Sequence, residues 1–409
     1  MDTLKLKENL FWTGILDPDL RTFDIIMETE FGTTYNSYLL KGTEKTAIFE
    51  TAKLKFYDTY LHKLRQLTDI QDIDYIIMNH TEPDHAGSIE KLLQLNPNIE
   101  IVGTTTAINF LKNIVNGPFK SRIVKENDTL SLGGKTLRFM QVPNLHWPDT
   151  MYTYDEDDKV LFTCDSFGAH YCFDEVLLSK VTDHEGYERA VKYYFDNILG
   201  PFKRFVLKAL NRIKDLEINM ICTGHGPVVD INIPDLMESY RNWSTVINPN
   251  AGLTVVIPYV SAYGYTKEMA VEIAKGISDS GPIEVHLFDM VIADKDKVLG
   301  EIGYADGILL GTPTILGDAL EPIWNLTTSM FSSIHGGKLA GAFGSYGWSG
   351  EAVPNMLERL KQIKLKVVAG LKVKFKPGEA DIASAYEYGY DFGCILQKKD
   401  NPRKADDHQ

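Results

Sequence analysis

Hydrophobic and polar positions form two different patterns that meet near residue 250. In the first 250 residues, short apolar runs alternate with turns and amphipathic stretches, and most of the histidines lie there. Short apolar runs bounded by turn residues are typical of strands, and apolar spacings of three and four are typical of helices. The pattern predicts strands at Thr34–Leu40, Thr46–Glu50, Tyr75–Met78, Ile99–Gly103, Thr136–Val142, Lys159–Cys164 and Ile218–Thr223, with helices at Phe56–Leu67, His85–Leu95 and Thr106–Val115.

The pattern changes after residues 247–252 (INPNAG), where Pro, Asn and Gly favour a turn or linker. From there, apolar runs alternate regularly with helical spacings, which is typical of a doubly wound parallel sheet. The predicted order is strand Leu253–Val260, helix Thr266–Ile277, strand Ile283–Phe288, strand Asp306–Gly311, helix Ala319–Phe331, strand Leu339–Gly344, helix Ser349–Ile363, strand Lys366–Val373 and helix Asp381–Leu396.

We therefore expect an α/β protein of two domains, residues 1–250 and 251–400, followed by a polar, disordered tail at 401–409. The length of 409 residues and the 44% content of hydrophobic residues suit two domains that each bury a core. A mean hydropathy of −0.17 and the lack of a long apolar run predict no transmembrane helix. The first residues also lack the pattern of a signal peptide, so we expect a cytoplasmic protein.

The net charge of −14 argues against nucleic acid and anionic membranes as partners, because both are bound through clustered lysine and arginine. An acidic protein partner would require a local basic patch. The four cysteines, Cys164, Cys172, Cys222 and Cys394, show no C-x-x-C spacing, so neither a thiolate metal site nor a disulfide framework is predicted.

Metal-ligand residues gather where apolar strands end in the first domain. His80, Glu82, Asp84 and His85 lie within six residues, directly after the predicted strand Tyr75–Met78. Other predicted strands run into His146, Asp165 and His225. Any one of these residues alone could cap a helix or satisfy a turn, but the same pattern at four strand ends favours a shared site.

These seven residues are too many for one metal ion but suit two ions that share a bridging carboxylate. Carboxylate and imidazole ligands without thiolate favour iron or manganese. The remaining histidines, at positions 62, 184, 286, 335 and 408, are expected at the surface or in the core. His170, five residues after Asp165, could reach the surroundings of the site.

The second domain carries loops suited to a flat phosphorylated ligand. A turn rich in hydroxyl groups and glycine opens the predicted helix at Thr266, where backbone N–H groups and the helix dipole can bind phosphate. Two further loops follow strand ends, where parallel sheets bind ligands. No G-x-G-x-x-G or ATP phosphate-binding motif is present here, so FMN is favoured. The candidate residues are Ser261, Ala262, Tyr263, Gly264, Tyr265, Thr266, Pro313, Thr314, Ile315, Leu316, Gly317, Ser345, Tyr346, Gly347, Trp348, Ser349 and Gly350.

Three further side chains near these motifs require separate predictions. Lys267 is expected to be an exposed helix residue. For Trp348, a place beside the flavin and a place in the core are equally compatible with the sequence. Trp147, next to His146, could likewise face a flavin or pack in the core.

The two halves together resemble a known family. The first half resembles the metallo-β-lactamase fold, but its H-x-H-x-D-H motif reads H-x-E-x-D-H here, with Glu82 at the second histidine. That change, joined to a flavodoxin-like half with S-x-Y-G-x-T and G-x-P-T loops, is similar to the flavodiiron proteins. The resemblance implies an αββα metallo-β-lactamase-like domain followed by a doubly wound flavodoxin-like domain.

The resemblance also implies the ligand set. One iron would be held by His80, Glu82 and His146, and the other by Asp84, His85 and His225, with Asp165 bridging the two irons of each chain. FMN would bind in the flavodoxin-like half. Tyr194 and His170 match positions that line the substrate pocket in family members.

The family forms head-to-tail homodimers, which can pair into homotetramers, and reduces dioxygen to water, nitric oxide to nitrous oxide, or both. Many members carry a pocket histidine in the N-terminal segment, but Thr22–Glu28 has none, which leaves the choice of gas open. This sequence contains no rubredoxin or flavin reductase domain, so we expect a separate electron donor, either a rubredoxin-like protein or a reduced deazaflavin.

Two other functions are compatible with parts of this pattern. A di-zinc hydrolase of the lactamase type would work without a reductant, but Glu82 argues against zinc. An FMN electron carrier with a structural metal domain would consume no dioxygen, but the complete ligand set argues against it.

Overall fold

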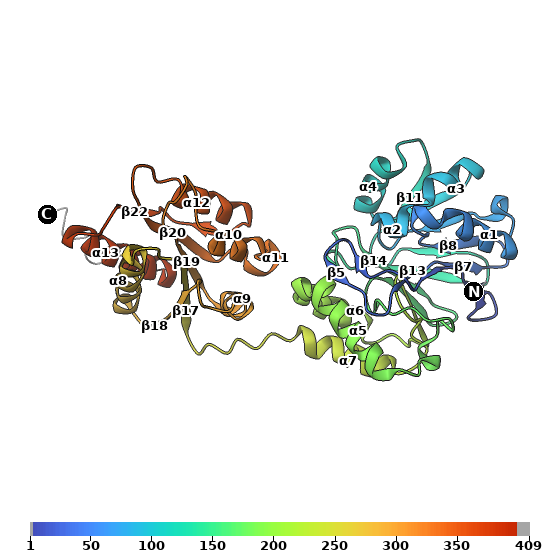
Figure 1. Cartoon of the computed structure of the whole chain (residues 1–409). Helices are drawn as coiled ribbons and strands as arrows, with labels where there is room; N and C mark the ends of the chain where they lie inside the picture. The colour runs from blue at the N-terminus through green and yellow to red at the C-terminus, as the bar shows by residue number, and fades with distance from the viewer. Residues whose placement is uncertain (1–2, 399–409) are drawn as a thin grey trace. The chain divides into compact units, whose positions relative to one another are not determined.

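The computed structural model describes residues 3–398, so the tail predicted at 401–409 lies outside the described residues (Figure 1). The chain divides into two compact units between Val246 and Ile247, and each unit contains its own hydrophobic core. Within residues 3–398, no helix combines the length and the apolar character that crossing a membrane requires.

The first unit contains two large β-sheets. In spatial order, the seven-stranded sheet is β1 (Leu4–Lys5), β2 (Leu10–Trp12), β7 (Tyr38–Lys41), β8 (Thr46–Phe49), β9 (Tyr75–Ile77), β10 (Glu100–Gly103) and β11 (Lys120–Ile123). The five-stranded sheet is β12 (Thr129–Ser131), β13 (Thr136–Gln141), β14 (Met151–Asp155), β15 (Val160–Cys164) and β16 (Met220–Thr223). Two small hairpins pair β3 (Ile15–Asp17) with β6 (Thr33–Tyr35) and β4 (Thr22–Phe23) with β5 (Met27–Glu28).

The two large sheets pack face to face through apolar side chains that alternate along their strands. The rings of Phe49 on β8 and Phe162 on β15 stack at 3.7 Å and join the sheets in one core cluster. Helices cover the outer faces, as Figure 1 shows, which gives the αββα layering that the family resemblance implied. The helices are α1 (Tyr57–Leu67), α2 (Pro83–Ala86), α3 (Ile89–Leu95) and α4 (Thr105–Val115) around the first sheet, and α5 (His184–Tyr194), α6 (Lys203–Ile213) and α7 (Ile233–Ser244) against the second.

Two predicted elements of this unit are wrong because polar residues interrupt them. The strand expected at Thr34–Leu40 is divided between β6 and β7, because Asn36 leaves the ladder and donates its side-chain amide to the carbonyl of Gly226 at 2.9 Å. The helix expected at His85–Leu95 is two helices, α2 and α3, separated at Gly87–Ser88, and the first begins already at Pro83. Both interruptions lie beside the ligand-type residues.

The second unit contains a parallel sheet with the order predicted for a doubly wound fold. Its strands are β18 (Ile283–Asp289), β17 (Leu253–Tyr259), β19 (Gly307–Gly311) and β20 (Leu339–Tyr346), followed at the edge by β21 (Lys366–Val367) and β22 (Leu371–Lys374), which both pair with β20. The sequence order 2-1-3-4-5 across the sheet is that of flavodoxin-like folds, in which ligands bind beyond the strand C-termini.

Helices cover both faces of this sheet. The helices α8 (Tyr265–Ser280) and α13 (Glu379–Gln397) pack on one face, and α9 (Lys295–Tyr304), α10 (Glu321–Thr328) and α12 (Ala352–Gln362) pack on the other, with the short α11 (Ser332–His335) beside them. The strand expected at Lys366–Val373 is two short strands, β21 and β22, and the helix expected to reach Phe331 ends at Thr328.

Candidate metal centre and flavin-binding loops

Four strand ends of the first unit bring the seven ligand-type residues together. His80 and Glu82 follow β9, and Asp84 and His85 lie on the short α2 behind them. The other three follow strands of the second sheet: His146 lies between β13 and β14, Asp165 directly after β15, and His225 after β16.

One group contains His80, Glu82, His146 and Asp165, whose ligand atoms all lie within 4.8 Å of one another. The Glu82 carboxylate lies 3.2 Å from Nε2 of His80 and 3.0 Å from Nε2 of His146. The Oδ2 atom of Asp165 lies 3.4 Å from both of these nitrogens.

The second group contains Asp84, His85 and His225, again with ligand atoms within 4.8 Å of one another. Nε2 of His225 lies 3.1 Å from Oδ2 of Asp84, and Nε2 of His85 lies 3.5 Å from Oδ1 of the same carboxylate. All three side chains are buried.

Asp165 faces both groups with different oxygens. Its Oδ1 lies 3.1 Å from Nε2 of His85 and 3.7 Å from Nε2 of His225, whereas its Oδ2 faces His80 and His146. A carboxylate with one oxygen toward each ligand cluster is arranged to bridge two cations.

The donor set fits two hard or borderline cations. Both carboxylate oxygens of the buried Asp84, and Oδ2 of the buried Asp165, have no hydrogen-bond partner. Burying a carboxylate without compensation is costly, and metal coordination is one of the few ways to offset that cost. Imidazole and carboxylate ligands suit iron. Cys164 lies near His85 and Asp165, but burial raises the pKa of its thiol well above the usual range, which keeps the thiol protonated, as expected for a buried cysteine.

Further hydrogen bonds fix the ligand rings. The Asp149 carboxylate accepts hydrogen bonds from the backbone and hydroxyl of Thr81, both at 2.8 Å, and lies 3.2 Å from Nδ1 of His80. Nδ1 of His225 donates to the carbonyl oxygen of Thr34 at 2.6 Å. Because the Nδ1 atoms are held in this way, the Nε2 atoms of both rings point into the site.

Electrostatic interactions among these groups shift their pKa values in opposite directions. Burial by itself would lower the pKa of His85, but Asp84 and Asp165 outweigh it and raise the value to about 9. Burial also opposes protonation of His146, but the neighbouring carboxylates of Asp165 and Glu82 raise its pKa to about 9. Despite burial, the histidines lower the pKa of Asp165 well below its usual range. The site therefore attracts positive charge, which protons and metal cations compete to supply.

The backbone around the site takes conformations that most residues avoid. Glu50 at the end of β8 and Cys164 at the end of β15 both have positive φ, 53° and 50°. A Cβ on Gly224 would lie 2.9 Å from Cε1 of His85, so only glycine fits there without a shift. Such strain at strand ends is common where a functional site requires it.

The structure places His170 and Tyr194 beside the second ligand group. The ring of His170 lies 5.3 Å from that of His225 and 4.9 Å from that of Tyr194, measured between centroids. Burial, with His225 adding to it, lowers the pKa of His170 well below its usual range, so this ring is neutral. Burial raises the pKa of Tyr194 well above its usual range, so the phenol stays protonated.

Three neighbours of the site were not predicted from the sequence. Asp149 follows His146 by three residues, but nothing in the local pattern shows that it reaches His80. Glu50 ends a predicted strand, so the strand-end pattern that identified the other ligands could have identified it as well. Burial raises the pKa of Glu50 to about 8 although His85 opposes this, and its Oε1 accepts the backbone N–H of Asn79.

The third neighbour is the hairpin of β4 and β5, which lies over the site. The ring centroid of Phe23 lies 4.4 Å from that of His170, and the Asp24 carboxyl lies close enough to Glu82 to feel its charge. Burial, then the charges of Glu82 and Asp84, raise the pKa of Asp24. The segment that lacks the family's pocket histidine therefore presents a carboxyl group instead.

The predicted flavin loops surround the strand C-termini of the second unit. The loop Ser261–Gly264 precedes α8, and Gly264 has a φ of 84°. The Ser261 hydroxyl accepts the backbone N–H of Lys267, and the hydroxyls of Thr266 and Ser345 lie 3.1 Å apart. The backbone at this helix N-terminus is suited to phosphate.

A cavity of about 370 Å³ lies between these loops, within the usual range for a cofactor pocket. Most of its walls come from predicted residues, and Phe375 is an addition that the sequence did not indicate. The predicted residues Ser261, Ala262, Gly264, Thr266, Gly317, Ser349 and Gly350 do not line it. The walls are Tyr263, Tyr265, Pro313, Thr314, Ile315, Leu316, Ser345, Tyr346, Gly347, Trp348 and Phe375.

The structure also tests the predictions made for several single residues. The side chain of Trp348 is 86% exposed at the cavity, so a place in the core is wrong. Lys267 is exposed, as predicted. Trp147 is half-buried and packs its ring 5.1 Å from that of His80. All four cysteines are free, and Cys172 is half-buried while the other three are buried.

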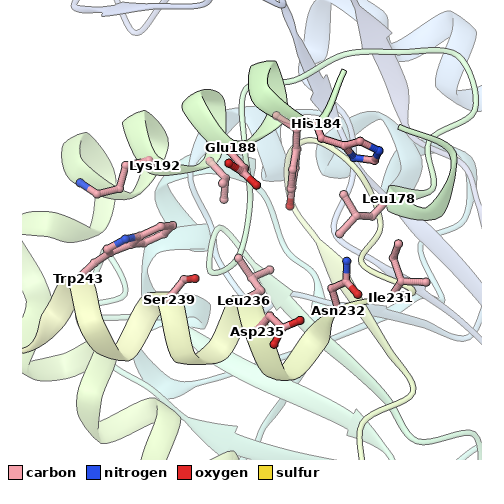
Figure 2. Close-up of a pocket in the computed structure, with 12 residues that line it drawn as sticks. Leu178, His184, Glu188, Lys192, Ile231, Asn232, Asp235, Leu236, Ser239 and Trp243 are labelled. Carbon is pink, nitrogen blue, oxygen red and sulfur yellow. The ribbon is translucent and has the colours of Figure 1, made fainter. Parts of the chain in front are cut away.

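Another pocket, of about 610 Å³, lies between α5 and α7 in the first unit (Figure 2). Glu188 and Lys192 on α5 face Leu236, Ser239 and Trp243 on α7 across it. None of the predicted metal or flavin residues lines this pocket.

Comparisons with known proteins agree with both units. Residues 33–226 match the family model of the ODP family beta lactamase, and residues 257–389 match the flavodoxin model. The chain is 42% identical to the flavo-diiron protein FprA2 of Clostridium acetobutylicum, over 96% of this chain and 99% of the relative. It is 37% identical to the type A flavoprotein fprA of Rhodobacter capsulatus, over 97% of this chain and 92% of the relative.

Solved structures similar to this chain include the flavodiiron protein of Giardia intestinalis, with a TM-score of 0.61 and 29% identity over 97% of each chain. They also include the rubredoxin:oxygen oxidoreductase of Desulfovibrio gigas, with a TM-score of 0.62 and 27% identity over 97% of this chain and 99% of that one.

Proposed function

The chain belongs to the flavodiiron proteins, oxidoreductases that use FMN and a diiron centre, and from this premise we propose that it reduces dioxygen to water, nitric oxide to nitrous oxide, or both. A separate donor supplies the electrons through FMN. The observation that carries the proposal is Asp165, whose two oxygens face two separate clusters of histidine and carboxylate ligands.

In this proposal, His80, Glu82 and His146 would hold one iron, Asp84, His85 and His225 would hold the other, and Asp165 would serve both. Asp149 and the carbonyl of Thr34 act through His80 and His225, because each fixes the ring nitrogen that does not face the metal. With seven protein ligands shared between two ions, coordination positions remain for a small molecule.

When bound, the two irons would supply a place for a diatomic gas and electrons for its reduction, and FMN would deliver electrons to them one at a time. The protein's own contribution is to position the ligands and exclude water. Five of the seven ligand residues are buried, whereas Glu82 and His146 are half-buried. A gas would therefore reach the site from the side of Glu82 and His146.

We propose that His170 and Tyr194 line the substrate pocket. Since the phenol of Tyr194 keeps its proton and the ring of His170 is neutral, both can donate hydrogen bonds without adding charge. Phe23 covers His170 on its other side, and Asp24 offers a carboxyl group next to Glu82. This pocket differs from one that contains an N-terminal histidine, and the difference bears on the choice of gas.

We further propose that the chain works as a head-to-tail homodimer, or as a homotetramer of such dimers, in which the FMN of one subunit serves the diiron centre of the other. The support is the family membership. Sedimentation equilibrium of the FMN-loaded protein measures the assembly state, and a strictly monomeric, active enzyme would contradict this part of the proposal.

The first experiment is to measure iron, zinc and flavin in anaerobically purified protein. We expect about two irons and one FMN per chain, as a site of two ligand clusters and one flavin pocket requires. Consumption of dioxygen and of nitric oxide by the reduced protein should then be recorded with gas-specific electrodes. If neither gas is consumed by protein that holds both cofactors, the proposal is wrong.

Zinc content distinguishes the proposed diiron reductase from a di-zinc hydrolase. Glu82 gives its cluster a hard anionic ligand that favours iron. Glu82→His replaces it with imidazole and should raise the ratio of zinc to iron several-fold after growth in medium containing both metals. Iron loading and gas consumption that survive Glu82→His unchanged would show that Glu82 does not select the metal.

A further inference from the structure

The pocket between α5 and α7 contains groups that neither the metal centre nor the flavin site uses (Figure 2). Its volume of about 610 Å³ lies within the usual range for a small-molecule site. All of its walls come from residues 178–243, so it lies wholly within the first unit. We call it the α5–α7 pocket, after the two helices that form it.

Two facing rows of side chains make the α5–α7 pocket elongated. Each helix contributes three wall residues spaced four apart, a spacing that places them on one face of the helix. The rows are His184, Glu188 and Lys192 on α5, and Asp235, Ser239 and Trp243 on α7. Figure 2 shows the two rows on opposite sides of the pocket. Since eight residues of helix span about 12 Å, the pocket has room for an extended chain of several carbon atoms.

The floor of the α5–α7 pocket is apolar. Leu178, Val191 and Leu236 line the pocket and belong to one hydrophobic core cluster of the first unit. Trp243 packs against the same cluster and is half-buried. Such a floor binds an aliphatic chain by removing its surface from water.

A buried hydroxyl group at the α5–α7 pocket has no hydrogen-bond partner. Tyr187 lines the pocket and is only 8% exposed. Within residues 3–398, its hydroxyl oxygen neither donates nor accepts a hydrogen bond. Buried polar groups are nearly always paired, because an unpaired one costs free energy. Tyr187 therefore indicates that the pocket takes a ligand with a polar group.

The charge at the α5–α7 pocket indicates which polar group that is. Glu188 and Asp235 line it from opposite helices, and no lysine, arginine or histidine nitrogen of residues 3–398 lies within 4.0 Å of either carboxylate. The amine of Lys192 is already bonded to Asp196 at 2.7 Å and lies 5.6 Å from the centre of the Trp243 ring. Two unpaired negative charges at one pocket attract a cation.

We propose that the α5–α7 pocket is a binding site for a small aliphatic amine. The ammonium group would lie between Glu188 and Asp235 and donate a hydrogen bond to the hydroxyl oxygen of Tyr187. The carbon chain would cover Val191 and Leu236. An ammonium group is a compact cation with three N–H donors, which matches two carboxylates and one phenol oxygen. The site is separate from the metal and flavin residues, so the inference does not rest on the proposed function.

Calorimetric titration of n-hexylamine into the iron- and FMN-loaded protein at low salt tests the proposal. We expect saturable binding of one amine per chain. Two comparison compounds separate the contributions of charge and chain: n-hexanol lacks the ammonium group, and ethylamine lacks most of the chain. Each should bind at least tenfold more weakly than n-hexylamine. Because the assembled protein is used, a pocket covered by a second subunit would show no binding and would contradict the proposal.

Glu188→Gln/Asp235→Asn should weaken n-hexylamine binding at least tenfold, because it removes both charges and keeps the side-chain shapes. Glu185→Gln/Glu238→Gln is the matched control. It also removes one exposed carboxylate from each of the two helices, but at positions that do not line the pocket. The control should bind within twofold of the wild type. The thermal unfolding midpoint of each variant shows whether the fold has survived.

Tyr187→Phe separates a ligand contact from a structural role, because it removes only the hydroxyl group. The variant should bind n-hexylamine about threefold to tenfold more weakly. Its unfolding midpoint without the amine should equal or exceed that of the wild type, because the variant buries one unpaired polar group fewer. A lower midpoint together with unchanged affinity would show that the hydroxyl serves the fold, and would contradict the proposal.

Three further results would overturn the inference. They are equal binding of n-hexanol or ethylamine, an equal loss in Glu185→Gln/Glu238→Gln, and tighter binding of hexanoate than of n-hexylamine, which would assign the pocket to an anion at Lys192. The titration is carried out without any gas. A failure of gas consumption would therefore reject the proposed function and leave the amine site standing.

Discussion

At the scale of single residues, the metal centre depends on carboxylates that serve two partners at once. Asp165 faces both ligand clusters, and Asp149 holds His80 and Thr81 together. Burial alone would raise the pKa of Asp149, but hydrogen bonds from His80 and Thr81 outweigh burial and lower it. Asp149 is therefore ionised next to His80 and keeps the Nε2 atom of that ring available for a metal.

Asp149→Asn should weaken iron binding by about tenfold to a hundredfold, the usual cost of losing a group that orients a metal ligand. Asparagine keeps the volume and one acceptor oxygen, so the loss measures the missing charge. Iron retained after dialysis against graded chelator concentrations gives the affinity. Asp215→Asn, at an exposed carboxylate in a surface turn, is the control and should retain iron like the wild type. Equal affinity in both variants would show that Asp149 does not support His80.

The histidine pKa values predict how pH acts on protein stripped of metal. The pKa values of His85 and His146 are raised from 6.5 to about 9 in the folded chain. Their stabilising effect is fully present below about pH 6.5 and is lost as pH rises toward about 9, because the folded state binds more protons than the unfolded state in that range. The unfolding midpoint of the metal-free protein should therefore fall across this range, by about 2–4 °C for each kcal/mol lost.

The metal-loaded protein should lack this decline, because the cations have displaced those protons. Thermal unfolding followed by circular dichroism at several pH values, with and without iron, measures both slopes. A metal-free protein that becomes more stable between pH 6.5 and 9 would contradict the assigned ion pairs between histidines and carboxylates.

At the scale of elements, close approach of α8 and α13 holds one face of the flavin-binding unit. A Cβ on Gly276 of α8 would overlap the carbonyl oxygen of Tyr386, and a Cβ on Gly389 of α13 would overlap that of Ile273. Both helices pack on the sheet through the same core cluster, which includes Ile273 and Phe392. The glycines therefore set the distance between the helices, and so the position of the α8 N-terminus beside the phosphate loop.

Gly276→Ala should destabilise this unit by about 1–3 kcal/mol, although alanine is the better helix former, because the added methyl group forces the helices apart. Gly300→Ala on α9 is the matched control, since no atom lies within 4 Å of a Cβ there. The control should be neutral or more stable by up to about 1 kcal/mol. Flavin fluorescence rises on heating when unfolding releases the quenched flavin, and the temperature of this rise gives the unfolding midpoint. A midpoint in Gly276→Ala at or above that of Gly300→Ala would refute the packing argument.

At the scale of the whole molecule, the two cofactor sites belong to separate units. The metal ligands all lie before Val246, and the flavin loops all lie after Ile247. The core clusters divide at the same place, so each unit holds its own site with its own packing. Loss of one cofactor should therefore leave the binding of the other intact.

Asp165→Ala should abolish gas consumption and lower iron to below one ion per chain, because it removes the only carboxylate that faces both clusters among the described ligands. FMN content and the rate of flavin reduction by the donor should remain within about twofold of wild type. Metal analysis, flavin absorbance and gas electrodes give the three values. Loss of FMN from Asp165→Ala would show that the units depend on each other.

Local sequence determined much of this protein. Apolar runs and turn residues predicted the strands that end in His80, Asp165 and His225 and the alternating strands and helices after residue 252, because these patterns act over a few residues. The H-x-E-x-D-H motif and the flavin loops likewise lie within short segments. Element ends were less well predicted, as at Asn36 and Gly87, because side chains from distant segments decide where pairing stops.

Only the tertiary structure decided which distant residues meet. It showed that Asp149 reaches His80 and that Phe23 and Asp24 lie over the metal centre. Each of these contacts joins elements far apart in sequence or depends on which strand forms the edge of a sheet. No local pattern encodes such contacts, because they result from how whole layers pack and from the order of the strands within them.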